Sequence, residues 1–229
     1  FGIHISLILL SMLFYGHFSD PKKYIFKFST VFSNCGFVGF PVVQGLLGNI
    51  GVFYTSIFTI PFNLFMWSYG VSLFMRQKSS GLWKNVLKNP PLIATMTGLL
   101  VFLLSLQLPS PVLKTLGSIG NMTTPISMFI IGSMLADVKP KDVFNDFSVY
   151  YLSVIKLLAA PVLTCYALRF FNTDPTLVAV SVILVAMPSA TMVGVFAEKY
   201  NSDKALASKC AFMTTILSML TIPLVIAIL

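Results

Sequence analysis

Two apolar stretches of this chain are interrupted by residues that open a helix and expose groups able to bind a ligand. The first interruption runs from Asn34 to Pro41 (NCGFVGFP) and lies within residues 28–75, which contain no Asp, Glu, Lys, Arg or His. Proline removes a backbone donor, and glycine tolerates dihedral angles that other residues resist. In a bilayer, an opened helix must find other partners for its freed N–H and C=O groups, so it occurs inside protein or at a cavity. The pattern is typical of a substrate site in a membrane transporter.

A second interruption, from Ala186 to Thr191 (AMPSAT), lies within the predicted membrane span 175–198. The two breaks fall in the second and seventh predicted spans, and this odd offset reverses the direction in which the chain crosses the membrane. Paired breaks of this kind indicate an inverted-repeat transporter whose site lies where the broken helices cross near the midplane. Pro41 and Pro188 are 147 residues apart, which gives the length of one repeat.

The chemistry expected at this crossing is the binding of an anion. The N-terminus of a half-helix presents free N–H groups and the positive end of the helix dipole to an anion. The side chains of Asn34, Ser189 and Thr191 add hydrogen bonds. We therefore assign substrate binding to these positions of the two breaks: Asn34, Gly36, Gly39, Pro41, Pro188, Ser189, Ala190 and Thr191.

Three charged residues are candidates for a role in coupling. Lys156 lies inside a span, about ten residues or ~15 Å from the nearest basic loop at the helical rise. That depth leaves two roles open: the lysine helps or responds to an anionic substrate, or it caps helix-end carbonyls and braces the broken helix. Glu198 and Asp137 close their spans on the predicted cytoplasmic side. Either acid is solvated at the interface or titrates during coupling, and the first role is favoured.

The composition indicates an integral membrane protein. Hydrophobic residues make up 56% of the chain, charged residues only 10%, and the mean hydropathy is +0.88. The formal charge of +8 comes from short loops between spans, which points to membrane topology and not to nucleic acid. Three scattered cysteines have no spacing for a metal or a disulfide, and no catalytic constellation is visible. We expect no enzyme activity, no metal and no cofactor.

Eight apolar stretches are long enough to be membrane helices. They are predicted at 1–18, 26–47, 51–75, 91–108, 115–136, 147–170, 175–198 and 205–229. Loops after the odd-numbered spans carry twelve basic residues, and those after the even-numbered spans carry two. The positive-inside rule therefore places the first set in the cytoplasm and both ends of the chain outside the cell membrane. The second repeat starts near Pro91, so two further helices are expected before Phe1.

Several motifs resemble the auxin efflux carrier family. The stretch from Asn34 to Val43, followed by Gly48 to Val52 (GNIGV), resembles the first crossover helix of that family. Four further stretches resemble the C-terminal signature of the family: MPSA at 187–190, FAEKY at 196–200, ALAS at 205–208 and TIP at 221–223. Residues 124–127 (TPIS) and 132–136 (GSMLA) are similar to its seventh helix.

The resemblance implies an all-α membrane fold of two inverted five-helix repeats, of which this chain supplies about eight helices. Residues 1–76 and 138–229 would be parts of a transport domain, 91–137 a scaffold part, and 77–90 a cytoplasmic linker. The implied activity is secondary active transport of a small organic anion by an elevator-like motion. The short loop from Arg76 to Pro90 departs from plant carriers and favours a bacterial type, associated with small carboxylates such as malate or malonate. Val193-Gly194 stands where plant carriers tend to have a second proline, which changes the expected geometry of the second break.

Two alternative functions remain at this point. A membrane sensor would keep the transporter fold and bind a ligand without moving it. A sodium symporter of the bile-acid type shares inverted repeats and crossed helices, but Asp and Glu are absent from both breaks here. Coupling to protons or sodium is left open, and so is assembly as a homodimer. The expected partners are a small organic anion and the lipid bilayer, without nucleic acid.

Overall fold

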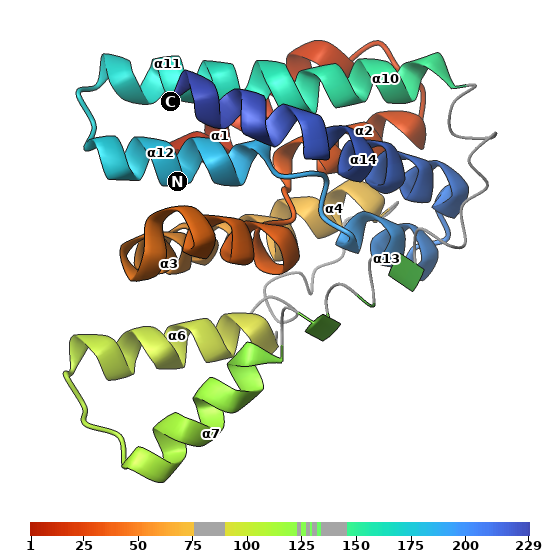
Figure 1. Cartoon of the computed structure of the whole chain (residues 1–229). Coiled ribbons are helices and arrows are strands. Elements are labelled where there is room, and N and C mark those ends of the chain that lie inside the picture. The colour runs from red at the N-terminus through yellow and green to blue at the C-terminus, as the bar shows by residue number, and fades with distance from the viewer. Residues whose placement is uncertain (76–89, 123–124, 127–128, 130–131, 134–145) are drawn as a thin grey trace.

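The regular structure of the described residues is helical, with one isolated β-bridge (Figure 1). The computed structural model describes residues 1–75, 90–122, 125–126, 129, 132–133 and 146–229. Three segments, marked η, are π-helical turns inside longer helices. The elements are α1 (Gly2–Tyr15), α2 (Lys22–Val31), η1 (Cys35–Gly39), α3 (Phe40–Phe65), η2 (Met66–Gly70), α4 (Val71–Phe74), α6 (Pro90–Leu103), α7 (Ser110–Asn121), α10 (Phe147–Val154), η3 (Ile155–Ala159), α11 (Ala160–Phe170), α12 (Pro175–Ala186), α13 (Met192–Lys199) and α14 (Lys204–Ile228).

Three helical runs in the described part of the chain are long and apolar enough to cross a membrane. They are Cys35–Phe74 with 40 residues, Phe147–Phe170 with 24 and Lys204–Ile228 with 25. Two shorter apolar helices, Gly2–Tyr15 and Pro175–Ala186, accompany them. The prediction of an all-α membrane fold is confirmed.

The longest of these runs reverses its direction at Gly48. This residue has φ 59° and ψ −149°, a conformation open almost only to glycine. A Cβ placed on Gly51 would lie 2.6 Å from Cγ1 of Val43, eight residues back along the chain. In a straight helix, eight residues span about 12 Å. The chain therefore folds back at Gly48, and the turn predicted between the spans 26–47 and 51–75 is present.

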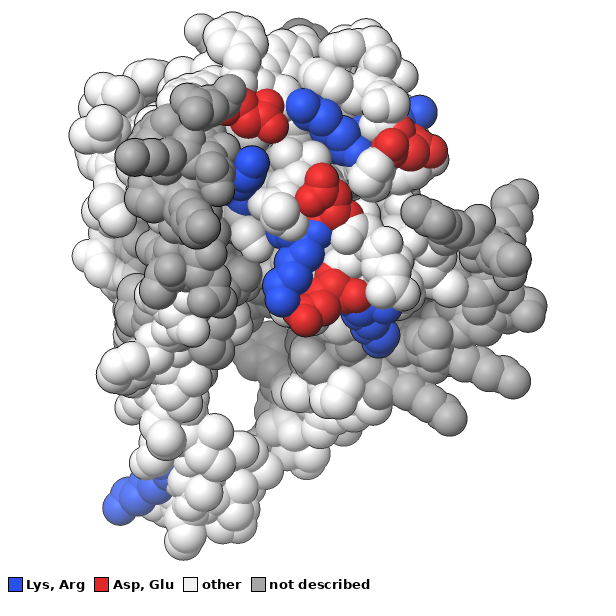
Figure 2. Space-filling view, turned by 90° about the vertical axis from the view of Figure 1, so that its right-hand side faces the viewer, with Lys and Arg blue, Asp and Glu red and all other residues white. Residues whose placement is uncertain are grey.

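Charged side chains gather at one end of the otherwise apolar helical body. In Figure 1 the N- and C-termini lie at the same end as the connection between α11 and α12. Figure 2 shows Lys, Arg, Asp and Glu side chains gathered on the opposite end. Lys22 pairs there with Asp146 at 3.6 Å. Partial burial raises the pKa of Asp146, but hydrogen bonds from Ser148 and the charge of Lys22 outweigh it, so this pKa is lowered.

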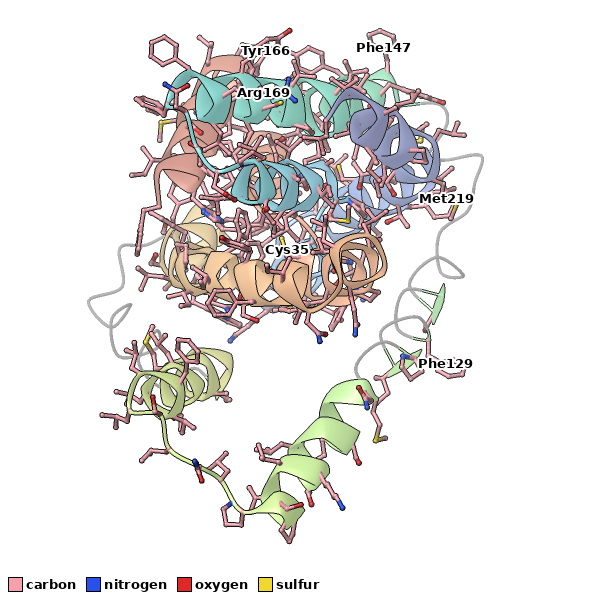
Figure 3. All side chains as sticks on the ribbon, turned by 60° about the vertical axis from the view of Figure 1, so that its left-hand side comes forward. Cys35, Phe129, Phe147, Tyr166, Arg169 and Met219 are labelled. Atoms are coloured by element: carbon pink, nitrogen blue, oxygen red, sulfur yellow. The ribbon has the colours of Figure 1, made fainter. Side chains whose placement is uncertain are left out.

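Apolar side chains cover both the inside and the outside of the body. Cys35 lies in the interior between the helices, whereas Phe147, Tyr166 and Met219 lie on the periphery (Figure 3). Their exposed fractions are 85%, 72% and 68%. Large exposed apolar side chains are the expected outer surface of a protein surrounded by lipid.

Helix α6 lies beside the main body, next to α3, and α7 follows it farther from the body (Figure 1). The rings of Phe102 on α6 and Phe53 on α3 are 5.8 Å apart. No residue of α7 is buried against the described part of the chain. The division into transport and scaffold parts stays a prediction. Most of the predicted linker lies outside the described residues, and so does Asp137.

The predicted orientation can be tested at two exposed turns. Asn172 connects α11 to α12, and Asn201 connects α13 to α14. We expect Asn172→Cys in intact cells to react with an impermeant maleimide, and Asn201→Cys to react only after permeabilisation. The native cysteines Cys35, Cys165 and Cys210 are buried and give a low background. The reverse labelling pattern would show that the charge bias assigns the wrong side.

Candidate functional site

The two interrupted helices meet at their breaks. Residues 32–34 leave the helix between α2 and η1, and residues 187–191 do so between α12 and α13. Ser33 and Ser189 form an isolated antiparallel bridge, which ties these segments although they are far apart in sequence. The antiparallel sense means that the breaks run in opposite directions, as inverted repeats require. The predicted crossing is therefore present.

Two backbone hydrogen bonds hold the crossing together. The N–H of Asn34 donates to the carbonyl of Pro188 at 2.7 Å, and the N–H of Ala190 donates to the carbonyl of Phe32 at 2.9 Å. Each opened helix thus satisfies backbone groups of the other. An unpaired backbone group in an apolar interior costs several kcal/mol by transfer scales, about 2–7. The pairing explains how both helices can open at the same depth.

Ser189 fastens the crossing to two neighbouring helices. Its N–H donates to Oγ1 of Thr214 on α14 at 3.1 Å, and its hydroxyl donates to the carbonyl of Ser29 on α2 at 3.0 Å. Thr214 in turn donates to the carbonyl of Cys210 at 2.7 Å. Because the two polar groups of Ser189 named here are both used inside the protein, this residue shapes the crossing. Thr214, which sequence reasoning missed, has the same role.

Lys156 braces the first break from the side. It belongs to η3, its exposed fraction is 0%, and its Nζ donates to the carbonyl of Thr30 at 3.0 Å and to the hydroxyl of Ser33 at 2.5 Å. A π-helical turn displaces one residue from the regular helical register, and such turns are frequent at functional sites. The sequence left two roles open for Lys156, an effect on an anionic substrate or bracing of the broken helix. The observed contacts favour the bracing role.

A cavity of about 250 Å³ opens at the crossing. It faces the N-terminal ends of the second half-helices, η1 and α13. The residues that line it are Ser33, Asn34, Cys35, Gly36, Phe37, Phe62, Asn63, Met66, Ala190, Thr191 and Met192. None of these residues carries a charge.

The wall of this cavity is rich in hydrogen-bond donors. Oδ1 of Asn34 accepts the N–H of Phe37 at 3.1 Å, as an N-cap residue does, which leaves the amide NH2 as a donor. Within the described residues, no acceptor is bonded to the backbone N–H of Gly36, Thr191 or Met192. Free N–H groups are expected in the first turn of a helix. They make this wall suitable for an anion.

The predicted site residues divide into two groups. Asn34, Gly36, Ala190 and Thr191 line the cavity, whereas Gly39, Pro41, Pro188 and Ser189 are not among its lining residues. A Cβ on Gly36 would meet no atom within 4 Å, so this residue borders open space. A Cβ on Gly39 would lie 2.8 Å from Cδ2 of Leu184, which is fully buried. Gly39 therefore lets the two broken helices pack closely.

Three lining residues come from the helix after the turn at Gly48. Phe62, Asn63 and Met66 reach the cavity from α3 and η2. Sequence reasoning missed them because they lie outside both breaks. A signal was present for Asn63, an amide inside an apolar run and two residues beyond Pro61.

Glu198 lies away from the cavity. It is exposed on α13, and its carboxylate pairs with Lys204 at 2.9 Å. These contacts are those of a residue solvated at an interface. A role in coupling remains a prediction.

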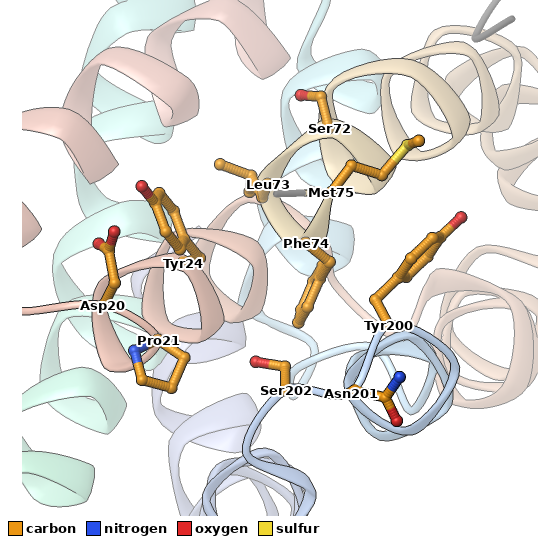
Figure 4. Close-up of a pocket in the computed structure, with 10 residues that line it drawn as sticks. All are labelled: Asp20, Pro21, Tyr24, Ser72, Leu73, Phe74, Met75, Tyr200, Asn201 and Ser202. Atoms are coloured by element: carbon orange, nitrogen blue, oxygen red, sulfur yellow. The ribbon is translucent and has the colours of Figure 1, made fainter. Parts of the chain in front are cut away.

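A larger cavity of about 470 Å³ lies where the α1–α2 connection, α4 and the end of α13 come together (Figure 4). It is lined by Asp20, Pro21, Tyr24, Ser72, Leu73, Phe74, Met75, Tyr200, Asn201 and Ser202. Asp20 is the single charged residue in this lining, and its negative charge disfavours an anion. No half-helix N-terminus of the crossing reaches this cavity. We therefore take the smaller cavity as the candidate site.

No three His, Cys, Asp or Glu side chains of the described residues lie close enough together to hold a metal ion. The cavity at the crossing offers N–H groups, amides and hydroxyls. N–H groups and hydroxyls donate hydrogen bonds, so this lining is suited to an anion.

The sequence is similar to known membrane transport proteins. It matches the family described as membrane transport protein over residues 1–82 and 75–226. An uncharacterized transporter of Methanothermobacter thermautotrophicus is 30% identical over 83% of this chain and 63% of its own length. A candidate malonate transporter of Rhizobium meliloti is 28% identical over 62% of this chain and 44% of its own length. A candidate auxin efflux carrier component of Oryza sativa subsp. japonica is 24% identical over 52% of this chain and 21% of its own length.

These alignments agree with the predicted resemblance to auxin efflux carriers. The chain spans less than two thirds of the length of each of these relatives. The similarity covers the part of the chain that holds both breaks, since the family match extends from residue 1 to residue 226.

The packing of the crossing can be tested with two matched glycine substitutions. Gly36→Ala and Gly39→Ala both gain about 0.5–1 kcal/mol from the loss of glycine flexibility in a helix. Only Gly39→Ala meets the buried Leu184 side chain, where overpacking costs about 1–3 kcal/mol. We expect the thermal midpoint of Gly39→Ala to fall below that of Gly36→Ala by about 2–4 °C per kcal/mol. Equal midpoints would show that the close approach at Gly39 is absent.

Proposed function

Because this chain belongs to the membrane transport protein family, we propose that it forms the anion-binding core of a secondary active transporter in the cell membrane. The observation that carries the proposal is the convergence of two half-helix N-termini, η1 and α13, on one cavity at the crossing. The chain does not contain the nucleotide-binding motif of a primary pump. Transport would then be driven by the gradient of the substrate, by the membrane potential or by a coupled ion.

Anion binding at this cavity would rest on dipoles and hydrogen bonds. Each helix N-terminus carries the equivalent of about half a positive charge, and the effect is strongest where water is excluded. The free N–H groups of Gly36, Thr191 and Met192 and the amide of Asn34 supply donors from both repeats. A carboxylate can accept from several of these groups at once.

The lining favours an anion with one carboxylate and an apolar remainder. The cavity contains no Lys or Arg to neutralise a second carboxylate, and that group would be desolvated against Phe37, Phe62 and Met66. The volume of about 250 Å³ lies just below the usual range of ligand pockets, so the substrate would be small. The expected substrate thus differs from malonate, which is named for the Rhizobium meliloti relative and carries two carboxylates.

The layout of the helices supports an elevator-like movement. Both breaks are fastened within one packed body, so their site would move as a unit. Helix α6 lies beside this body and contacts it at α3, and α7 follows α6 farther from the body (Figure 1). We propose that the body carries the bound anion past a scaffold to which α6 and α7 belong.

Substitution of the two cavity amides tests the proposed site. Asn34→Ser keeps an N-cap acceptor for Phe37 and removes the amide donor, and Asn63→Ala removes the second amide. A hydrogen bond to a charged group contributes about 1.5–3 kcal/mol, so we expect each variant to lose roughly 10- to 100-fold in carboxylate affinity. Asn49→Ala, at an exposed turn in the same helical hairpin, is the matched control and should keep the wild-type affinity.

The measurement is uptake of labelled carboxylates by proteoliposomes, together with binding to the purified protein. Short monocarboxylates with an apolar body should be carried better than dicarboxylates of similar size. Preferential uptake of malonate would contradict the proposed substrate class. Binding without any uptake would favour the sensor function. If both amide variants kept wild-type binding and uptake, this cavity would be excluded as the substrate site.

A further inference from the structure

The ends of the first half-helices form a second pole of the crossing, opposite in charge to the helix N-termini at the cavity. The first half-helices α2 and α12 end there at Val31 and Ala186. The Ser33 hydroxyl donates to the carbonyl of Val185 at 3.3 Å, so the two helix ends lie close together. The C-terminal end of a helix carries the equivalent of about half a negative charge and unpaired carbonyl groups. Two converging C-termini make this pole attractive to a cation.

Lys156 places its amine at this pole. Its contacts are oxygen atoms without a formal charge, the carbonyl of Thr30 in the last turn of α2 and the hydroxyl of Ser33. No carboxylate of the described residues pairs with it, since the ion pairs found there are Lys22–Asp146 and Lys204–Glu198. Unwound carbonyls and half-helix C-termini are also the groups that coordinate sodium in transporters with broken helices.

We propose that the Lys156 ammonium is a tethered cation that fills the cation-binding pole of the crossing and so replaces an inorganic coupling ion there. The pole that stays open is the one with the two N-termini and the uncharged cavity. The crossing then has a cation supplied by the protein on one side and a binding site for an exchangeable anion on the other. Sodium or potassium has no vacant place among these oxygens, so neither ion should stabilise the wild-type crossing.

The tethered cation would be present whether the protein transports an anion or only senses it. Removal of the lysine side chain should therefore leave a site for a small cation. Lys156→Ala should lower the thermal midpoint of the purified protein because Thr30 and Ser33 lose their donor. Ammonium or methylammonium chloride should restore about 2–4 °C relative to the same concentration of tetramethylammonium chloride, since each kcal/mol shifts the midpoint of a chain of this size by about that amount.

Two controls separate cation binding from general effects of salt. Lys156→Met fills the volume with an apolar chain, so ammonium should not stabilise it more than tetramethylammonium does. Lys114→Ala, on the exposed helix α7, should behave as the wild type. An equal response of Lys156→Ala to ammonium and tetramethylammonium would overturn the proposal, and so would stabilisation of the wild type by sodium over choline.

If Lys156→Ala does not fold, hydrogen exchange in Lys156→Met still tests the role of the lysine. In Lys156→Met, hydrogen exchange at the N–H groups of Asn34 and Ala190 should be at least about tenfold faster than in the wild type, which corresponds to about 1.4 kcal/mol. Exchange in α7, which is exposed and lies away from the crossing, should be unchanged. Unchanged exchange at both crossing N–H groups would contradict the role of Lys156 at this pole. No substrate is needed, so a failure here is distinct from a failure of the proposed transport function.

Discussion

The requirement that buried backbone groups be paired controls the structure of this protein. A helix that opens inside an apolar body exposes N–H and C=O groups, and lipid offers them no partners. The two breaks solve this together, since Asn34 donates to Pro188 and Ala190 donates to Phe32. Neither opening is satisfied without the other. The pairing is antiparallel, so it is available only to segments that cross the membrane in opposite directions, and the inverted repeat provides such a pair.

Opening two helices at one place also separates charge. Four helix ends meet at the crossing: the C-termini of α2 and α12 on one side and the N-termini of η1 and α13 on the other. Lys156 occupies the negative side, and a cavity without charged residues lies at the positive side. Thr214 and Ser189 fasten the arrangement to α14 and α2, so the surrounding helices hold these ends in register. The binding properties that we propose follow from this placement and need no charged side chain in the cavity.

Much of this arrangement could be predicted from the sequence, because the interruptions are local and unusual. Asn34 to Pro41 and Pro188 stand out against apolar flanks, and their offset by an odd number of spans implies opposite directions. Gly48 predicted the turn that its positive φ now explains. The roles of individual residues were harder, because they depend on tertiary packing. Gly36 borders the cavity and Gly39 packs on Leu184, although both are glycines of one break. Asn63 reaches the site only because the chain folds back at Gly48. The pattern of apolar and polar residues alone does not place Asn63 close to the two breaks.

We propose that an anion binds at the positive side of the crossing. The most direct measurement is hydrogen exchange of the purified protein with and without a saturating monocarboxylate. The account predicts slower exchange at the N–H groups of Gly36, Thr191 and Met192, because these groups would then donate to the carboxylate. Protection confined to the other cavity, around Tyr24, Ser72 and Tyr200, with no change at the three crossing N–H groups, would contradict the claim.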